Sequence, residues 1–453
     1  MITTIRNAWK IEDLRKKLLF TLFALLIFRL GSVVPVPFIS SQALQQYLNA
    51  QSGTIFDLMN AMSGDAFAQA TVFALSIQPY INSSIIIELL CIAIPALERL
   101  KKEGGEEGQK KIAAITRYTT VAIAVLQGFG YFTLIRSWNN AYGGTLLNTH
   151  GVPMWLAGVI IVLAFTAGSA FLMWLGEQIT EFGIGNGISM ILFAGIVSRV
   201  PSMVWSMIHG VQSWSSDRAA NAALEEGAEA VHTAGAMHPV FIPLFIIGML
   251  LLVIFIVFIT NSERRIPVQY AKRVVGRKMY GGQSTHLPMK VNMSGVLPII
   301  FAQAIASLPA TIAAFIPGGS ESTFMKVFSN NGLLYGVVYF LLIVGFSYFY
   351  SSIQFNPIEV ANNLKNNGGF VPGFRPGKPT ADFIQKVLSK ITMFGALYLA
   401  VIALLPIITG NIIGNTSLSI GGTSVIIVVG VALETVKALE AQMLMRHYKG
   451  FLE

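Results

Sequence analysis

Ten long apolar segments constrain the fold of this chain more than any other feature of its sequence. A helix needs about 20 apolar residues to cross the hydrocarbon core of a bilayer. Apolar runs between charged or Gly/Pro-rich breaks predict spans at 17–36, 70–95, 112–136, 153–176, 187–208, 239–260, 295–316, 333–354, 385–408 and 421–443. Because a backbone in lipid must satisfy its own hydrogen bonds, these spans predict an all-α polytopic membrane protein.

The composition excludes the main alternative class, a soluble globular enzyme. Of the 453 residues, 54% are hydrophobic and only 12% are charged, whereas soluble domains carry roughly 25% charged residues. The single cysteine, Cys91, lies in an apolar run and permits no internal disulfide. Basic residues precede the first span, as in a signal peptide, but no small-residue cleavage site follows it. We therefore expect a retained first helix.

The positions of the positive charges predict the orientation in the membrane. Of the 31 Lys and Arg residues, 26 lie at the two termini or in one alternating set of connections, and Arg29 and Arg199 lie within spans. The opposite connections hold only Arg136, Arg218 and Lys326. Since basic connections stay in the cytoplasm, both termini are expected there. The loops 261–294 and 355–384 lie on the same side and should form ordered loops or hairpins, because neither has the apolar content of a domain.

Two connections are expected on the outer side of the membrane, at 209–238 and 52–69, and their sequences differ in character. The connection 209–238 contains a small-residue, helix-favouring stretch at 219–226, and we assign no function to it. The segment 52–69 is too short and polar to span, and Ile55, Leu58, Met59 and Met62 have the spacing of an amphipathic helix. It is either an interfacial helix or a re-entrant element that other helices shield from lipid.

Nothing in the sequence specifies an enzyme, a metal site or a cofactor. The glycine-rich stretch 183–187 has no strand before it and no Lys-Ser/Thr after it, so it is interpreted as a tight interhelical turn rather than a phosphate loop. Ionisable residues in the spans are few, with Arg29, Glu88 and Glu434 as the main examples. That pattern gives weak support for ion coupling. A secondary transporter with repeated five-helix halves remains an alternative, and a membrane-embedded enzyme is a more distant one.

Neutral polar residues are more frequent in the spans than charged ones. They include Asn82 in the second span, Gln127 in the third and Gln303 with Ser307 in the seventh. Such side chains join helices with about 0.6–2 kcal/mol per hydrogen bond, which fits a seam that opens reversibly and equally a permanent contact. Apolar pairs four residues apart, such as Ile77 with Ile81, indicate only a lipid-facing or core position.

Several longer strings resemble the bacterial SecY family. They are LSIQPYINSSII at 75–86, GEQITEFGIGNGIS at 176–189, STHLPMKVN at 284–292, FNP at 355–357, GFRPG at 373–377 and GGTS at 421–424. The resemblance runs in order through nearly the whole chain. It implies the central channel of the general protein-export machinery, with ten helices in two pseudo-symmetric halves at 1–208 and 239–453, joined by the loop 209–238.

The resemblance also implies the positions of four functional regions. A pore ring of apolar side chains would consist of Ile77, Ile81, Ile188, Leu192, Ile300 and Ile427. A lateral gate to lipid would run past Asn82, Gln127, Gln303, Ser307 and Leu308. A plug helix within 52–69 would present Ile55, Phe56, Leu58, Met59 and Met62. A docking surface in the two basic loops would contain Arg264, Arg265, Lys272, Arg273, Arg277, Lys278, Arg375 and Lys378.

From this resemblance we expect a passive, non-enzymatic conduit in the bacterial cytoplasmic membrane. The expected partners are the motor ATPase SecA, the ribosome, the small membrane subunits SecE and SecG, and preproteins with signal sequences. Basic loops attract anionic motor surfaces and ribosomal RNA, but they also set topology and bind anionic lipids, which accounts for part of the charge. Within the GFRPG turn, the resemblance singles out Arg375 as the residue needed for coupling to the motor.

Overall fold

Helices make up most of the protein in the computed structural model, which describes residues 2–50, 60, 63–141, 144–149, 151–222, 238–270, 273–275, 278–280, 284–293, 295–306, 309, 333–413 and 422–449. The helices are α1 (Ile2–Lys10), α2 (Glu12–Gly31), α3 (Ser41–Ala50), α5 (Gln78–Ala93), α6 (Pro95–Lys102), α7 (Gly105–Ala141), α8 (Met154–Phe182), α9 (Gly187–Val197), α10 (Val200–Ala222), α11 (Phe241–Asn261), α12 (Leu297–Ala306), α15 (Leu333–Gln354), α16 (Pro357–Asn366), α17 (Lys378–Ile413) and α18 (Gly422–Lys449).

Each of the ten predicted spans overlaps one of these helices. Within the part of the chain that the structure describes, six helices are long and apolar enough to cross a membrane. The number is seven if the bent pair α5 and α6 counts as one span. The all-α membrane fold is therefore confirmed, whereas the count of ten crossings remains a prediction.

The predicted bounds of two early spans were wrong because prolines end or begin helices. The first span was expected at 17–36, but α2 ends at Gly31, before Pro35. The second was expected from residue 70, but α5 begins only at Gln78. Pro79 has no backbone N–H to donate to an earlier turn, so it suits the first turn of a helix and not its interior.

Two apolar runs that were each predicted as a single helix are interrupted in the structure. Ile94 precedes Pro95 and adopts an extended conformation, which separates α5 from α6 with a bend of 102°. A residue before proline is disfavoured in the α region, which accounts for the break. The fifth predicted span, 187–208, is interrupted after Val197, and the next helix, α10, extends to Ala222.

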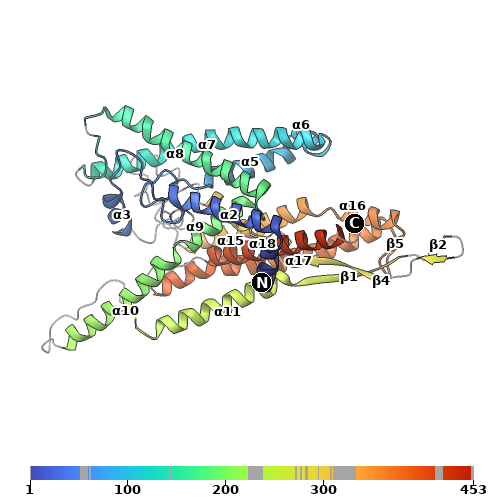
Figure 1. Ribbon diagram of the computed structural model, residues 1–453. Helices are drawn as coiled ribbons and strands as arrows, with labels where there is room; N and C mark the ends of the chain where they lie inside the picture. The colour runs from blue at the N-terminus through green and yellow to red at the C-terminus, as the bar shows by residue number, and fades with distance from the viewer. Residues whose placement is uncertain are drawn as a thin grey trace.

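Three buried apolar clusters organise the helical body. One is built from residues between Val36 and Phe165, on the segment after α2 and on α3, α7 and α8. A second is built from residues between Ile256 and Leu433, on α11, α12, α15, α17 and α18. The third takes residues from both regions, including α2, α5, α8, α9, α12 and α18. The two groups of helices, blue to green (α2 to α9) and yellow-green to red (α11 to α18) in Figure 1, therefore meet at the third cluster.

A small β-sheet joins the two predicted basic loops. Strand β1 (Glu263–Tyr270) pairs antiparallel with β4 (Ser284–Lys290) along seven residues, and with β5 (Gly369–Phe370) on its other edge. Short strands β2 (Arg273–Val275) and β3 (Lys278–Tyr280) continue the hairpin. In Figure 1 this hairpin, α6 and α16 lie at one end of the molecule, and α3 and the far end of α10 lie at the other. The expected hairpin in 261–294 is thus present.

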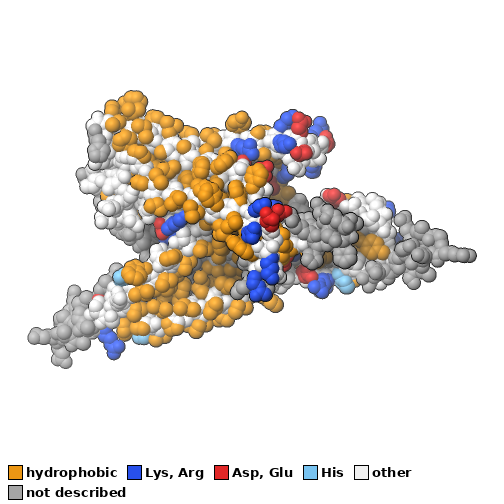
Figure 2. Space-filling model, in the orientation of Figure 1, with side chains coloured by type: hydrophobic (Ala, Val, Ile, Leu, Met, Phe, Trp, Pro, Cys, Tyr) orange, Lys and Arg blue, Asp and Glu red, His pale blue; other side chains and the backbone are white. Residues whose placement is uncertain are grey.

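The outer surface of the helical body is apolar. Figure 2 shows hydrophobic side chains along the flanks of the helices, with charged side chains gathered at the end that holds α6. Helix α11 is the extreme case, because Leu251, Ile254 and Phe258 are each more than 60% exposed. A soluble monomer rarely exposes an apolar surface of this extent, so these faces identify a multi-pass membrane protein.

Candidate functional site

The six residues expected in the pore ring all lie in the cluster where the two groups of helices meet. Ile77, Ile81, Leu192, Ile300 and Ile427 are buried members of that cluster, and Ile188 packs against it. They come from four places, two in each group: α5 with the residue before it, α9, α12 and α18. The structure therefore brings aliphatic side chains from four separate parts of the sequence into one buried cluster between the two groups of helices.

The non-helical segment 71–77 places Ile77 against α8. The Ser169 hydroxyl of α8 donates a hydrogen bond of 3.2 Å to the Ser76 carbonyl oxygen. Gly168 permits this approach, because a Cβ atom there would collide with the Val72 carbonyl oxygen. Further along α8, a Cβ on Gly176 would be 3.5 Å from Ile77 Cδ1 and 3.4 Å from Ile188 Cγ1. Small residues on α8 thus bring two ring side chains to the same point.

The turn between α8 and α9 fixes the position of the ring residues on α9. The Asn186 side-chain oxygen accepts hydrogen bonds from the backbone N–H groups of Ile188 and Ser189, at 3.0 and 3.3 Å, and so caps α9. Thr180 accepts from the Gly187 N–H at 2.9 Å. The glycine-rich stretch is therefore a tight interhelical turn, as its sequence predicted.

Two contacts link the groups of helices around the ring. Helix α12 contacts α5, and α18 contacts α9. On the second of these, the Thr435 hydroxyl lies 3.5 Å from the Met190 sulfur. The buried apolar side chains of the third cluster make up another part of this contact.

The residues expected at the lateral gate have buried polar atoms. The side-chain oxygens of Asn82 on α5 and Gln127 on α7 are buried and accept no hydrogen bond from the residues that the structure describes. Gln303 on α12 is also buried. Ser307 and Leu308 lie outside the described residues. An unpartnered buried acceptor is costly, and both a seam that exchanges partners and a permanent contact remain possible interpretations of these positions.

The expected plug side chains, Ile55, Phe56, Leu58, Met59 and Met62, lie outside the described residues. Residues 63–70 come directly after them and form a compact series of turns, which we name the 63–70 turn. The Asn60 amide donates to Asp65 Oδ1 at 2.9 Å and its oxygen accepts from the Ala68 N–H at 2.9 Å. The Tyr131 hydroxyl donates to the Phe67 carbonyl oxygen at 2.5 Å, which ties the turn to α7.

The sequence did not predict that two arginines, Arg199 and Arg29, contact the 63–70 turn. Arg199, in the break between α9 and α10, pairs with Asp65 at 3.0 Å between Nε and Oδ1. Arg29 of α2 donates a hydrogen bond of 3.4 Å to the Gly64 carbonyl oxygen. The available signal was that both arginines fall inside predicted spans, where a charge needs a partner. The sequence did not indicate which partner each would have.

The expected docking residues divide into three groups. Arg264 and Arg265 are exposed on β1, where Arg265 pairs with Glu263 at 2.7 Å. Arg273 and Lys278 are in the short strands β2 and β3, and Lys272 and Arg277 lie outside the described residues. Arg375 and Lys378 are exposed at the start of α17. Pairing of β5 with β1 holds the segment that precedes the third group beside the strand that carries the first group.

The turn around Arg375 is fixed by local contacts. The Thr380 hydroxyl donates to the Arg375 carbonyl oxygen at 2.8 Å, and the neighbouring Phe374 ring stacks on Phe383 with 4.2 Å between ring centroids. The Phe374 N–H also donates to the Val371 carbonyl oxygen at 3.1 Å. The backbone is thus anchored on both sides of Arg375, while its guanidinium remains exposed to a partner.

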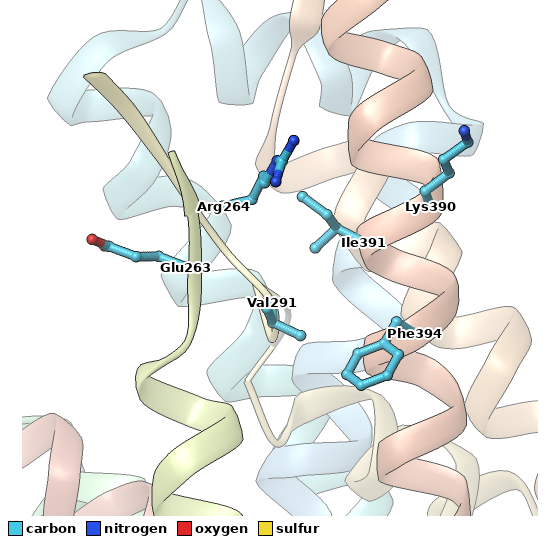
Figure 3. A pocket seen from close by; sticks show the side chains of 6 residues that line it. All are labelled: Glu263, Arg264, Val291, Lys390, Ile391 and Phe394. Carbon is cyan, nitrogen blue, oxygen red and sulfur yellow. The ribbon is translucent and has the colours of Figure 1, made fainter. Parts of the chain in front are cut away.

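A hollow of about 300 Å³ lies at the base of this sheet, away from the ring. It is lined by Glu263, Arg264, Val291, Lys390, Ile391 and Phe394. Figure 3 shows Val291 and Phe394 at its apolar floor, whereas Glu263 points away from it. No group of three or more His, Cys, Asp or Glu that could hold a metal is present among the described residues, here or elsewhere.

Comparisons of this chain with a family model, with related sequences and with solved structures agree with one another. The family model described as SecY matches residues 71–436. The protein translocase subunit SecY of Streptomyces coelicolor is 43% identical over 460 residues, which cover all of both chains. A solved protein-conducting channel superposes with a TM-score of 0.62 at 17% identity, covering 95% of this chain and 92% of that one. Sec61 from a canine ribosome–channel complex gives a TM-score of 0.60 at 16% identity, with the same coverage.

Proposed function

The chain belongs to the SecY family of protein translocase subunits, and from this premise we propose that it is a passive protein-conducting channel. It would secrete unfolded preproteins across the bacterial cytoplasmic membrane and release membrane proteins sideways into the lipid. The chain is a channel subunit and not an enzyme. We assign the energy of transport to partners, which push the substrate.

The observation that carries this proposal is the convergence of the six ring residues between the two groups of helices. A narrow ring of aliphatic side chains disfavours water and ions, because neither finds a hydrogen-bond partner there. The same side chains bind no particular sequence, and they can move aside around a chain in transit. One structure thus serves as a seal at rest and as a non-selective passage in use.

We assign the lateral gate to the boundary between two pairs of helices, α5 with α7 on one side and α12 with α15 on the other. Asn82, Gln127 and Gln303 support the assignment, because their polar atoms are buried where helix packing is otherwise apolar. A signal sequence of 7–15 apolar residues would enter there and replace these contacts with its own packing. Residues 52–69 would plug the ring from the outer side, as the resemblance implies.

The basic sheet is the proposed docking surface for SecA and for the ribosome. Arg264 on β1 and Arg375, in the turn between β5 and α17, are exposed, and β1 pairs with β5. The hairpin of β1 and β4 and helix α16 lie at the same end of the molecule as α6 (Figure 1). A solved relative comes from a ribosome–channel complex, which supports the ribosome as a partner. SecE and SecG as companion subunits, anionic lipids around the basic loops and cytoplasmic termini complete the proposal.

The test is transport by the purified channel, with its companion subunits, in lipid vesicles. With SecA, ATP and a signal-bearing preprotein, we expect the preprotein to become protected from external protease. Replacing Ile77, Ile81 and Ile188 by Ser should raise the resting ion leak severalfold, since hydroxyl groups let the ring hold water. Uptake of a small solute without preprotein transport would contradict the proposal and favour a transporter.

A matched control separates a ring effect from loss of stability. Ile161 on α8 is fully buried, but it belongs to the first cluster and not to the ring. Its replacement by Ser creates a comparable polar defect in a core. We expect Ile161→Ser to reduce the yield of folded protein without a larger ion leak per folded channel. An equal leak from this variant would remove the ring residues from the constriction.

A further inference from the structure

Helix α1 connects the two groups of helices, although it precedes the first of them in the sequence. Ile11, between α1 and α2, is extended, with φ −90° and ψ 118°, so α1 does not continue the axis of α2. Helix α1 instead contacts both α2 and α18. Because α18 belongs to the second group, α1 reaches from the first group across to the second.

A small buried cluster, which we name the strap cluster, fills this contact. Its buried members, each at most 2% exposed, are Ala8, Leu14, Ile184 and Leu439. Ala8 is on α1 and Leu439 is on α18, so the cluster joins the two groups through apolar burial. The Thr4 hydroxyl of α1 also donates a hydrogen bond of 3.2 Å to the Glu440 carboxylate of α18.

The strap cluster also holds the start of α9. The Ile184 N–H, in the turn between α8 and α9, donates a hydrogen bond of 3.2 Å to the Thr21 hydroxyl of α2. Gly185 follows with φ +75°, and a Cβ atom there would be 3.4 Å from the Thr435 hydroxyl of α18. Helix α9 begins shortly after this turn and carries two of the ring residues. The strap cluster therefore fastens the start of α9 to α18.

The two groups of helices meet in two zones, and the strap cluster lies beside only one of them. Helix α18 contacts α9 in the first zone, and α12 contacts α5 in the second. A movement that parts the second zone leaves the strap cluster intact. A movement that parts the first zone must expose its buried apolar side chains, which is unfavourable.

We propose that α1 is a strap that makes the contact of α9 with α18 the pivot of channel opening. This inference rests on the proposed channel function. The two groups then turn about the strapped zone and part between α5 and α12, so that the ring widens toward one side. Ala8 and Leu439 are positioning residues, because they lie in the strap cluster and not in the ring.

The experiment measures distances between paired spin labels by electron–electron double resonance, in channels with their companion subunits in lipid vesicles, with and without a synthetic signal peptide. Cys91→Ala first removes the only cysteine of the sequence. One pair, Glu181→Cys with Ala441→Cys, uses exposed positions on the two sides of the pivot. The other, Leu126→Cys with Leu341→Cys, uses exposed positions on α7 and α15, across the proposed gate. With peptide, the gate pair should lengthen by about 5 Å or more and the pivot pair by less than about 2 Å.

Two variants loosen the strap from opposite sides. Ala8→Asp places a charge at a fully buried position of α1, and Leu439→Ala removes buried apolar volume on α18. The matched controls are Asn7→Asp and Leu444→Ala, which make the same kinds of change at exposed positions of the same helices. In both loosened variants the peptide should also lengthen the pivot pair by about 5 Å or more. The controls should behave as the wild type.

Two results would overturn the proposal. The first is a wild-type pivot pair that lengthens as much as the gate pair, and the second is a pivot pair that stays fixed in the loosened variants. If Ala8→Asp does not fold, Leu439→Ala decides alone. Protection of a preprotein from protease, with SecA and ATP in the same vesicles, tests the function separately. If the wild type transports no preprotein, the channel function fails. If it transports and its pivot pair lengthens, only the strap is refuted.

Discussion

Asn186 is a single residue on which the position of two ring side chains depends. Its oxygen caps α9 through the N–H groups of Ile188 and Ser189, and Ile188 and Leu192 lie within the next two turns. Asn186→Ala leaves those donors without their partner and should lower the free energy of unfolding by about 1 kcal/mol. Unfolding in mixed detergent–SDS micelles measures the change.

The control for this cap is Asn186→Asp, which keeps the acceptor oxygen and adds a negative charge at the start of a helix. That charge is favourable at a helix N-terminus, so the Asp variant should be at least as stable as the wild type. If Ala and Asp variants have the same stability, the cap does not contribute. The sequence around 183–187 predicted the tight turn, but only the structure identifies which side chain caps the helix.

The hairpin of β1 and β4 is the element whose packing presents the basic surface. Along β1, Ile266 and Val268 are buried in one cluster with Ile384 and Leu388 of α17, while Pro267 between them is exposed. Ile266→Ala removes part of this contact, and large-to-small changes in a core cost about 2–5 kcal/mol. We expect amide hydrogen exchange in β1 and β4 to become faster by roughly 30-fold or more.

Gln269→Ala is the matched control, because Gln269 lies on the exposed face of the same strand. It should leave the exchange of β1 and β4 close to that of the wild type. Equal acceleration in both variants would mean that the hairpin is not held by its apolar face. Binding to SecA should weaken only in the Ile266 variant, if the position of Arg264 matters for docking.

At the level of elements, hydrophobicity located the helices and left their ends unresolved. An apolar run shows where a helix can be buried. The run alone does not show that a helix begins near Pro79 or breaks before Pro95, because these boundaries depend on the conformational restrictions of proline and of the residue before it. The segment 71–77 is mostly apolar and yet forms turns rather than a helix, and its Val72 lies directly against Gly168 of α8. Strand β5 has only two residues, so no periodicity could have revealed that the two basic loops share a sheet.

For the candidate site, the sequence provided the residue types and the structure provided their neighbours. Spacing assigned Ile77, Ile81, Ile188 and Leu192 only to lipid or core, and resemblance to a family placed them in a ring. Their meeting in one cluster is a long-range contact that no local pattern encodes. The partner of Arg199 is a similar case, because Asp65 precedes it by more than a hundred residues.

At the scale of the whole molecule, the proposed pore ring and the proposed docking surface lie at different positions. The ring lies where the two groups of helices meet, whereas the basic sheet lies at one end beside α16 and the start of α17. Helix α17 connects the sheet with the second group of helices, since Ile384 and Leu388 pack under the sheet and Leu399 belongs to the second cluster. A partner that pushes on the sheet can thus act on the helices of the second group.

Arg375 is the residue through which we expect that push to act. Its backbone is anchored by Thr380 and by the Phe374–Phe383 stack, so its charge is presented at a fixed place. Arg375→Glu reverses the charge without touching those anchors. SecA-dependent transport of a preprotein into vesicles should fall at least about tenfold, a loss expected when one central charged contact becomes repulsive. Membrane insertion, folding and signal-peptide-induced current should remain at the wild-type level.

Lys365→Glu makes the same change in charge on the same connection and is the control for this prediction. Lys365 is exposed in the last turn of α16, outside the anchored turn. If docking of SecA depended only on general attraction between a basic surface and an acidic motor, both variants would lose the same fraction of transport. Added salt would then also reduce transport by the wild type to a similar rate. If the fixed position of one arginine matters, Lys365→Glu should retain most of its transport. Normal transport by Arg375→Glu would exclude this residue from coupling.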